Sequence, residues 1–204
     1  MMNPLQQKKP GTEHWYEKPF FVTFIPIAQF IIAVGGLVLF INFFLIQSYI
    51  VNGSSMADTL HNNDRLIISK LGKSWSNITG SAYLPSRGEI VVFHDPSGSD
   101  RQLIKRVIGL PGERITLRSG ELTIYNEFSP NGFDPDVEFD INTYTNGEEF
   151  DITIPEGHLF VVGDNRNPGG SSDSRNSFGP VDNQYLVGKL ILRVLPLSDA
   201  KFFK

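Results

Sequence analysis

The feature that most constrains this chain is a long uncharged stretch near its N-terminus. Residues 19–57 contain no Asp, Glu, Lys or Arg, and the part from Phe24 to Ile46 is mostly apolar. As an α-helix this part would measure roughly 34 Å, enough to cross a bilayer core of about 30 Å. It is too long for the apolar region of a cleaved signal peptide, and Gln47 to Val51 matches a cleavage site poorly. A buried core helix is the remaining alternative. We therefore predict a transmembrane helix over residues 24–47.

The charges on either side of this stretch predict its orientation. Three lysines precede it and only two cations follow it closely, namely Lys8, Lys9 and Lys18 before it and Arg65 and Lys70 after it. Because positive charge is retained on the cytoplasmic side, the N-terminus is expected there. Residues 1–23 are then a cytoplasmic segment, and residues 48–204 are a domain outside the cytoplasm. This is the pattern of a single-pass protein of the plasma (cytoplasmic) membrane.

Beyond residue 48 the apolar runs become short, and Gly, Pro, Asn and Asp separate them. Five such runs stand out: Leu66–Ile68, Ile90–Phe93, Leu122–Tyr125, Leu159–Val162 and Leu190–Leu192. No helical period longer than two turns is evident, so the pattern predicts an all-β domain of many short strands. Arg118 to Glu121 is typical of a hairpin turn. Residues 130–147 are rich in Asn, Asp, Gly and Pro, which predicts a surface excursion.

Composition excludes several kinds of function. The formal net charge of −4, with no basic region, argues against a nucleic-acid partner. The absence of cysteine excludes both disulfides and a cysteine nucleophile. None of the four histidines lies in a recognisable catalytic motif, and no His, Asp or Glu cluster has the spacing of zinc ligands. We therefore expect neither a Ser-His-Asp triad nor a metal or other cofactor.

Three segments carry groups that could perform chemistry. The first, Asn52 to Met56, places a pair of serines directly after the apolar stretch, although such a pair after Gly is usually a turn. The third, Gly163 to Arg175, is dense in Ser, Asn, Asp and Arg, although taken alone it reads as a polar, Gly-rich loop. Neither segment identifies a function without the other.

The second segment runs from Leu103 to Gly112 and contains a lysine with a strand pattern around it. Alternation along a strand puts Lys105 on one face with Leu103 and Val107, while Arg106 points away. A lysine among aliphatic side chains loses hydration, which disfavours its charged form and lowers its pKa. A lysine of lowered pKa is suited to act as a general base. The alternative is an exposed lysine on an edge strand.

Together, and in this order, the three segments resemble the type I signal peptidases, which are Ser/Lys-dyad serine peptidases. That family carries Gly/Ser-x-Ser-Met after a membrane span, then Lys-Arg-x-x-Gly-Leu-Pro-Gly, then Gly-Asp-Asn-Arg followed by Ser-x-Asp-Ser-Arg. Arg87–Phe93 and Ile154–Phe160 are similar to two further family segments. The resemblance covers roughly residues 30–196. It implies the complex β fold shared by signal peptidases and self-cleaving repressors, preceded by one transmembrane helix.

The resemblance implies a role for each matched residue. Ser55, directly before Met, is the nucleophile, and Lys105 is the general base, with the backbone N–H of Ser55 in the oxyanion hole. Ser171 orients the Lys105 amine, and Asp173 and Arg175 form a paired scaffold. We further expect Met56, Ile104 and Val162 to form the walls of shallow substrate pockets.

The sequence departs from the family pattern at three places. The family has Pro where Asp58 stands, and some members have a hydroxyl where Gly53 stands. Four residues separate Arg166 from Ser171, where the family has two. Alignment on Gly163 to Arg166 would select Gly169 as the lysine partner, which has no hydroxyl. Alignment on the Ser-x-Asp-Ser-Arg segment selects Ser171, with Ser172 as the second choice.

The function implied is cleavage of N-terminal signal peptides from secreted preproteins after small-x-small sites. The expected partners are preprotein signal peptides and the lipid bilayer. A self-cleaving repressor is a related alternative, but such proteins carry a DNA-binding domain where this chain has the apolar stretch. A catalytically inactive, membrane-tethered β module that binds peptides is a second alternative, because of the departures named above. A plain membrane-anchored structural protein, the third, would need neither Ser55 nor Lys105.

Overall fold

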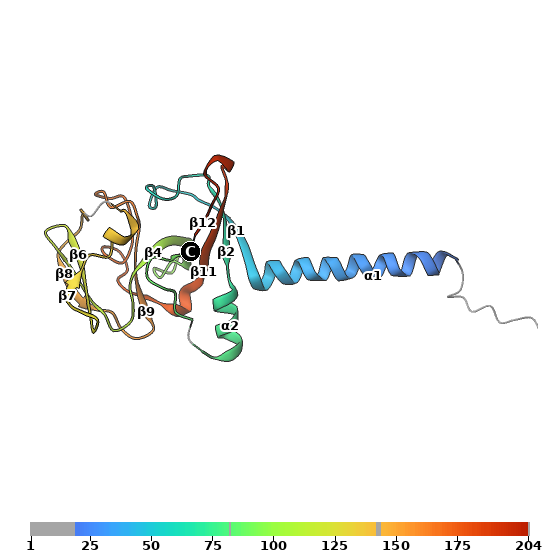
Figure 1. Ribbon diagram of the computed structural model, residues 1–204, viewed down its shortest axis with the longest axis horizontal. Coiled ribbons are helices and arrows are strands. Elements are labelled where there is room, and N and C mark those ends of the chain that lie inside the picture. The colour runs from blue at the N-terminus through green and yellow to red at the C-terminus, as the bar shows by residue number, and fades with distance from the viewer. Residues whose placement is uncertain (1–18, 82, 142–143, 204) are drawn as a thin grey trace, which may run out of the picture. The chain divides into compact units, whose positions relative to one another are not determined.

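The structure is a computed structural model that describes residues 19–81, 83–141 and 144–203 (Figure 1). The chain forms two compact units, Met1–Asn42 and Phe43–Lys204, and each is described by itself. The predicted cytoplasmic segment, residues 1–23, falls mostly outside the described residues.

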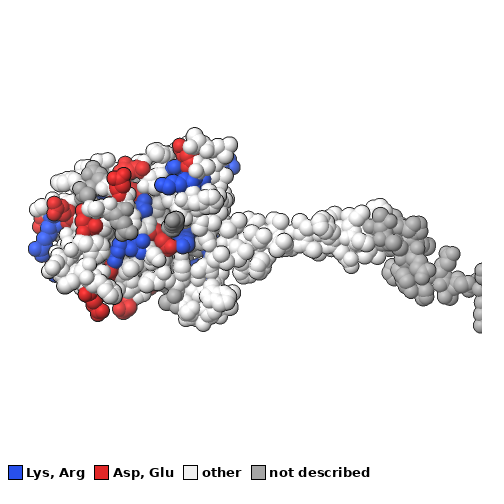
Figure 2. All heavy atoms as spheres, viewed as in Figure 1, with Lys and Arg blue, Asp and Glu red and all other residues white. Residues whose placement is uncertain are grey.

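The first unit contains the helix α1 (Pro19–Phe40), and a π-helical turn η2 (Ile41–Leu45) follows it. Large apolar side chains along α1, such as Phe30, Ile31 and Leu39, are exposed. Figure 2 shows no Lys, Arg, Asp or Glu along the described length of this helix. Judged by length and hydropathy together, none of the helices within the described residues qualifies as a membrane span. The predicted span over 24–47 also extends beyond the helix, because strand β1 begins at Ile46.

The second unit is built on two antiparallel sheets. The larger sheet has the order β1-β2-β11-β3-β4-β9-β10, with β12 paired to β11, and the smaller has the order β7-β6-β5-β8. The strands of the larger sheet are β1 (Ile46–Ile50), β2 (Arg65–Ser69), β3 (Ile90–His94), β4 (Gln102–Gly109), β9 (His158–Val162), β10 (Val181–Asp182), β11 (Leu186–Leu195) and β12 (Lys201–Phe202). Those of the smaller sheet are β5 (Arg114–Arg118), β6 (Glu121–Asn126), β7 (Ser129–Phe133) and β8 (Phe150–Thr153). Figure 1 shows β6, β7 and β8 at the opposite end of this unit from β1 and β2.

The apolar runs became strands because each could bury its side chains. In β3, Ile90 and Val92 pack into one core cluster, while Val91 and Phe93 pack into another, so this strand is buried on both faces. That explains its unbroken apolar sequence. All five predicted runs lie in strands, and Ser119 and Gly120 form the predicted β5–β6 turn, both with positive φ. The prediction of a predominantly β domain is therefore confirmed.

Two sequence predictions were wrong in part. The domain is not all-β, because it contains the helix α2 (Leu71–Thr79) and the short helices η3 (Val137–Phe139), η4 (Asn183–Tyr185) and η5 (Leu197–Asp199). The stretch 130–147 is not only a surface excursion. Its Asp136, Ile141 and Thr145 are buried. The two polar side chains, Asp136 and Thr145, can be buried because both accept hydrogen bonds from Arg166.

Strand connectivity brings the three chemically interesting segments together. Ser55 lies on the turn between β1 and β2, and Lys105 lies on β4. Strand β4 pairs with β9, with Arg106 opposite Val162, and the loop that starts at Gly163 leaves the end of β9. The backbone N–H of Asn165 donates to the carbonyl of Ser55 at 3.1 Å, which joins this loop to the first segment.

Candidate active site

The nucleophile candidate stands on a turn with two buried anchors. Met56 and Leu60 are almost fully buried, and the N–H of Leu60 donates to the Met56 carbonyl at 2.6 Å. Hydrogen bonds from Val51 N to Asp64 O and from Asn63 N to Val51 O, both 2.9 Å, close the base of the turn. Because Met56 fills the core, the preceding residue, Ser55, is held at the surface of the domain.

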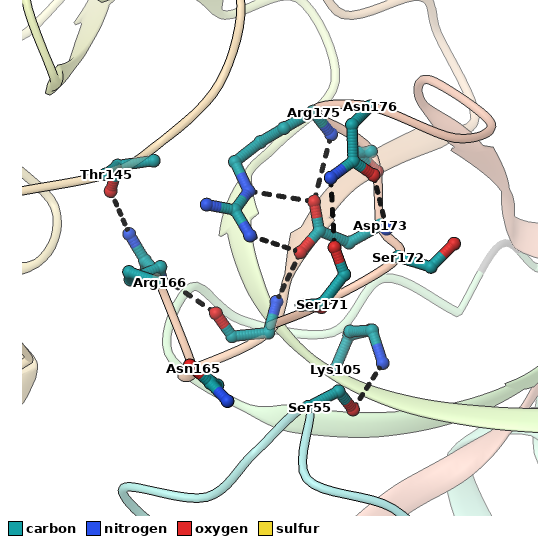
Figure 3. Close-up of polar contacts among 12 residues, drawn as sticks. Ser55, Lys105, Thr145, Asn165, Arg166, Ser171, Ser172, Asp173, Arg175 and Asn176 are labelled. Carbon is teal, nitrogen blue, oxygen red and sulfur yellow. Dashed lines mark hydrogen bonds and ion pairs between the residues drawn. The ribbon is translucent and has the colours of Figure 1, made fainter. Parts of the chain in front are cut away.

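Lys105 meets Ser55 directly. Its Nζ donates to Ser55 Oγ at 2.8 Å and to the Ile104 carbonyl at 2.9 Å (Figure 3). Only 2% of Lys105 is exposed. Burial lowers the pKa of Lys105 to about 8, against the partial opposition of the Asp173 and Asp164 carboxylates. This environment agrees with the lowered pKa that the strand pattern predicts, so about a tenth of the amine is neutral and able to accept a proton at pH 7.

Asp173 and Arg175 form a buried ion pair behind the dyad. Asp173 accepts hydrogen bonds from Arg175 Nε at 2.9 Å and Nη2 at 2.8 Å, and from the Gly163 N–H at 3.0 Å. Burial by itself would raise the pKa of Asp173, but the Arg175 guanidinium holds it below its ordinary value. The two residues therefore pair with each other, and Asp173 also holds the backbone N–H of Gly163.

Ser171 and Ser172 differ sharply in their surroundings. Ser171 is buried, and its Oγ has no hydrogen-bond partner among the described residues, Lys105 included. It lies close to Gly163, because a Cβ built on that glycine would be 2.3 Å from Ser171 Oγ. Ser172 is exposed, and its hydroxyl lies 2.5 Å from that of Ser177. The geometry therefore favours Ser171 over Ser172 as the group beside the dyad.

A second buried network joins Asp164, which the resemblance suggests as a further contributor to the scaffold, to Arg106 and Thr59, which sequence reasoning did not select. Asp164 accepts both a bidentate pair from Arg106, at 2.9 and 2.6 Å, and a 2.5 Å bond from Thr59 Oγ1. Arg106 points away from Lys105, as strand alternation predicts, and its target is this carboxylate. The network ties the turn that carries Ser55 to β4 and to the Gly163 loop. The only sequence signal was the presence of Arg106 and Asp164 within two of the motifs.

A third network explains why the segment 130–147 is partly buried. Arg166 is 2% exposed, donates from Nε to the Gly163 carbonyl at 2.9 Å and pairs with Asp136 through both terminal nitrogens. It also donates to Thr145 Oγ1 at 2.8 Å. Gly163 is therefore held through its N–H by Asp173 and through its carbonyl by Arg166.

Neither of the two departures within the Ser55 turn places a side chain against the dyad. The Asp58 side chain is exposed, and Thr59, not Asp58, makes the side-chain contact from this turn to the buried network. Gly53 has a φ of 113°, which disfavours any residue with a side chain, and a Cβ built there would meet open space. No hydroxyl at residue 53 is thus available to an oxyanion.

A small cavity of about 130 Å³ opens beside Ser55 and Lys105, with Ile50, Leu66 and Ile104 among its lining residues. Of the three predicted wall residues, Ile104 lines this cavity. Met56 and Val162 lie in the core clusters with 1% and 0% exposure and are not part of the lining. Only Ile104 therefore has the position expected of a substrate contact.

The reactive groups of the site come from side chains on separate segments of the chain. Across the residues that the structure describes, no group of three or more His, Asp or Glu side chains is arranged to hold a metal ion. The site brings together a hydroxyl, an amine of lowered pKa, and a cavity of about 130 Å³. Such a constellation is suited to covalent attack on a carbonyl carbon.

Comparison with known proteins gives a consistent answer. Residues 24–195 match the family described as signal peptidase, peptidase S26. The chain is 31% identical over 173 residues to signal peptidase I U of Bacillus subtilis, covering 84% of this chain and 87% of that protein. It is 31% identical over 183 residues to signal peptidase IB of Staphylococcus aureus, covering 84% and 90% respectively. A crystal structure of a signal peptidase I from Enterococcus faecalis matches 54% of this chain and 99% of that one, with 31% identity and a TM-score of 0.40.

The protein is therefore a serine peptidase. Because the match extends over most of the chain, it belongs to the signal peptidase family, peptidase S26.

Proposed function

We propose that this protein is a membrane-bound signal peptidase that cleaves signal peptides from secreted preproteins after small-x-small sites, with Ser55 as nucleophile and Lys105 as general base. The observation that carries this proposal is the 2.8 Å contact between the buried Lys105 amine and the Ser55 hydroxyl. A catalytically inactive peptide-binding module would not need a buried lysine amine against a serine hydroxyl, since burial of a lysine is costly.

The reaction would proceed in two halves. Neutral Lys105 takes the Ser55 proton as Oγ attacks the scissile carbonyl, and the Ser55 N–H stabilises the resulting oxyanion. The lysine then returns the proton to the leaving amine, which leaves an acyl-enzyme on Ser55. Lys105 next activates a water molecule, which hydrolyses the ester and regenerates the hydroxyl. Ser171 would hold the amine in position during both halves.

The shape of the site is compatible with an extended peptide substrate. A cavity of about 130 Å³ lies beside Ser55 and Lys105, where it could receive a side chain of the substrate next to the scissile bond. Strand β1 is at the edge of the larger sheet, and its residues Tyr49 and Ile50 line this cavity. An extended peptide could add to such an edge and place alternate side chains into pockets.

Membrane attachment is proposed from the apolar stretch 24–47. It has no charged residue, and large apolar side chains of α1 such as Phe30, Ile31 and Leu39 are exposed. By the distribution of lysines, residues 1–23 would be cytoplasmic and the catalytic domain would lie outside, at the plasma membrane. The substrates, also held in the bilayer by their signal peptides, would then meet the enzyme at raised effective concentration.

The first test is cleavage of a preprotein with an Ala-x-Ala site by the full chain in liposomes. We expect a single cut after the second alanine, mapped by N-terminal sequencing of the product. Replacement of that alanine by leucine should reduce kcat/KM at least about 100-fold, because the proposed preference is for small residues at this position. Failure to cut several such preproteins, or equal cleavage of the leucine substrate, would contradict the proposal.

The rate of cleavage should depend on pH in a way set by Lys105. Because the neutral amine is the base, log kcat/KM is expected to rise with slope one as pH increases and to level off near pH 8. Each pH unit below that point should cost about tenfold. Circular dichroism at each pH serves as the control for folding. A profile that levels off only near 10.5, the ordinary value, would show that Lys105 is not desolvated in the working enzyme.

A further inference from the structure

The side chain of Asn165 is placed against the backbone of the nucleophile. Its Nδ2 donates to the Ser54 carbonyl at 3.0 Å, and its own backbone N–H donates to the Ser55 carbonyl at 3.1 Å. Figure 3 shows Asn165 next to Ser55, on the loop that begins after β9. Asn165 therefore contacts the peptide groups on both sides of the Ser55 α-carbon.

The contact with Ser54 has a direct consequence for Ser55. The carbonyl of Ser54 and the N–H of Ser55 belong to one planar, trans peptide group, so they point in opposite directions. Ser54 O accepts from Asn165 Nδ2 on one side and from the Ala57 N–H, at 3.0 Å, within the turn. Fixing this oxygen fixes the direction of the Ser55 N–H. The Ser55 N–H has no acceptor within the described part of the chain, so it is available to donate a hydrogen bond to a substrate.

The Asn165 amide is itself held by the loop 167–170. Asn167 donates to Asn165 Oδ1 from its backbone N–H at 3.3 Å and from its side-chain amide at 3.1 Å. Gly170 packs so closely that a Cβ built on it would lie 2.4 Å from Asn165 Oδ1. With Oδ1 occupied as an acceptor, the amide must present Nδ2 to Ser54, which determines the orientation of the side chain.

We propose that Asn165 is a positioning residue for the oxyanion hole: its amide, held by the loop 167–170, keeps the Ser54–Ser55 peptide turned so that the Ser55 N–H faces the developing oxyanion. The inference rests on the proposed Ser55 mechanism. It matters more in this chain because Gly53 offers no second donor from its side chain. In this proposal the loop 167–170, which is longer than in the family pattern, serves to hold the Asn165 amide in position.

The test combines steady-state kinetics with two ligands that differ at one group. The first is a peptide aldehyde ending in Ala-x-Ala, to whose carbonyl the Ser55 hydroxyl adds without a leaving group, which places an oxygen in the oxyanion hole. The second is the matching peptide alcohol, which cannot form this adduct. For Asn165→Ala we expect kcat to fall about 10- to 100-fold with KM little changed. Aldehyde affinity should fall in parallel, while alcohol affinity stays constant.

Two further variants complete the design. Gly170→Ala, which pushes against Asn165 Oδ1, should lower kcat and aldehyde affinity in the same direction by about tenfold, and it carries the test if Asn165→Ala fails to fold. The control is Asn126→Ala in the β6–β7 turn, which removes an asparagine that likewise braces backbone N–H groups, those of Phe128 and Ser129. It should leave the ratio of aldehyde to alcohol affinity unchanged.

Each outcome has a distinct meaning. If the wild type cleaves the preprotein but Asn165→Ala keeps its kcat and aldehyde affinity, the positioning role is wrong and the proposed function stands. Equal weakening of aldehyde and alcohol would also overturn the role, because it indicates general damage to the cavity. If the wild type neither cleaves the preprotein nor prefers the aldehyde, the proposed function is wrong, and the inference falls with it.

Discussion

Replacing either Ser55 or Lys105 by alanine is expected to reduce cleavage of an Ala-x-Ala preprotein by about 10⁴-fold or more. The two groups act on the same proton, so loss of either removes the attack itself, while binding of substrate persists. The double variant should therefore be no slower than either single variant, because groups that act as one unit are not additive. Single-turnover cleavage with purified, folded protein measures these rates.

Two variants make this result specific. Ser54→Ala should stay within several-fold of the wild type, because the Ser54 side chain is exposed and does not contact Lys105. Lys105→Arg should be as inactive as Lys105→Ala, because a guanidinium stays protonated and cannot serve as a base. Residual cleavage by Ser55→Ala above the Lys105→Ala level would mean that another nucleophile operates, and activity in Lys105→Arg would mean that a positive charge, not a base, is required.

The contact between Ser55 and Lys105 could be expected from the sequence because both residues belong to short patterns with a local physical meaning. Strand alternation around Lys105 predicts an amine surrounded by aliphatic groups, and it is almost fully buried. The serine pair was separated into nucleophile and neighbour by the resemblance to a family, not by any local property. In the structure only Ser55 contacts the lysine.

The sequence was not sufficient to predict the buried ion pairs. Arg106 and Asp164 are far apart along the chain, as are Asp136 and Arg166, and nothing local indicates that one selects the other. Polar composition over 130–147 predicts exposure, but an aspartate can be buried when a guanidinium satisfies both its oxygens. Pairing of this kind depends on tertiary structure, which a single sequence does not reveal.

The helix α2 was missed for a related reason. It is short, contains Gly72 and several Ser and Asn residues of low helix propensity, and exposes its apolar Trp75 and Ile78. Its beginning is stabilised from outside, because Ser74 Oγ donates to the Phe44 carbonyl at 2.8 Å and the Lys70 N–H donates to the Leu45 carbonyl at 2.8 Å. Its apolar residues Leu71, Trp75 and Ile78 do recur at helical spacing, but over only about two turns, which is too short a pattern to identify a helix.

Gly163 joins two of the buried networks, because Asp173 accepts from its N–H and Arg166 donates to its carbonyl. Replacement of Gly163 by alanine should have the second-largest effect on kcat, after the Ser55 and Lys105 variants. An added Cβ would lie 2.3 Å from Ser171 Oγ and 2.4 Å from the backbone oxygen of Ser55. Gly163 cannot move aside cheaply, because Asp173 holds its N–H and Arg166 holds its carbonyl. The strain must then displace Ser171 and the nucleophile. We expect kcat to fall about 100- to 1000-fold, since displacement of a reacting group by about 1 Å has a cost of this order.

The matched control for this change is Gly98→Ala, in the turn between β3 and β4. Gly98 has a φ of 86° and open space around its α-carbon, so alanine there strains the backbone by about 1 kcal/mol without touching the site. Gly98→Ala should lower the unfolding temperature and keep kcat, whereas Gly163→Ala should lose kcat even at temperatures where it is fully folded. If both variants lost activity only in proportion to the unfolded fraction, the close approach of Gly163 to Ser55 would have no catalytic role.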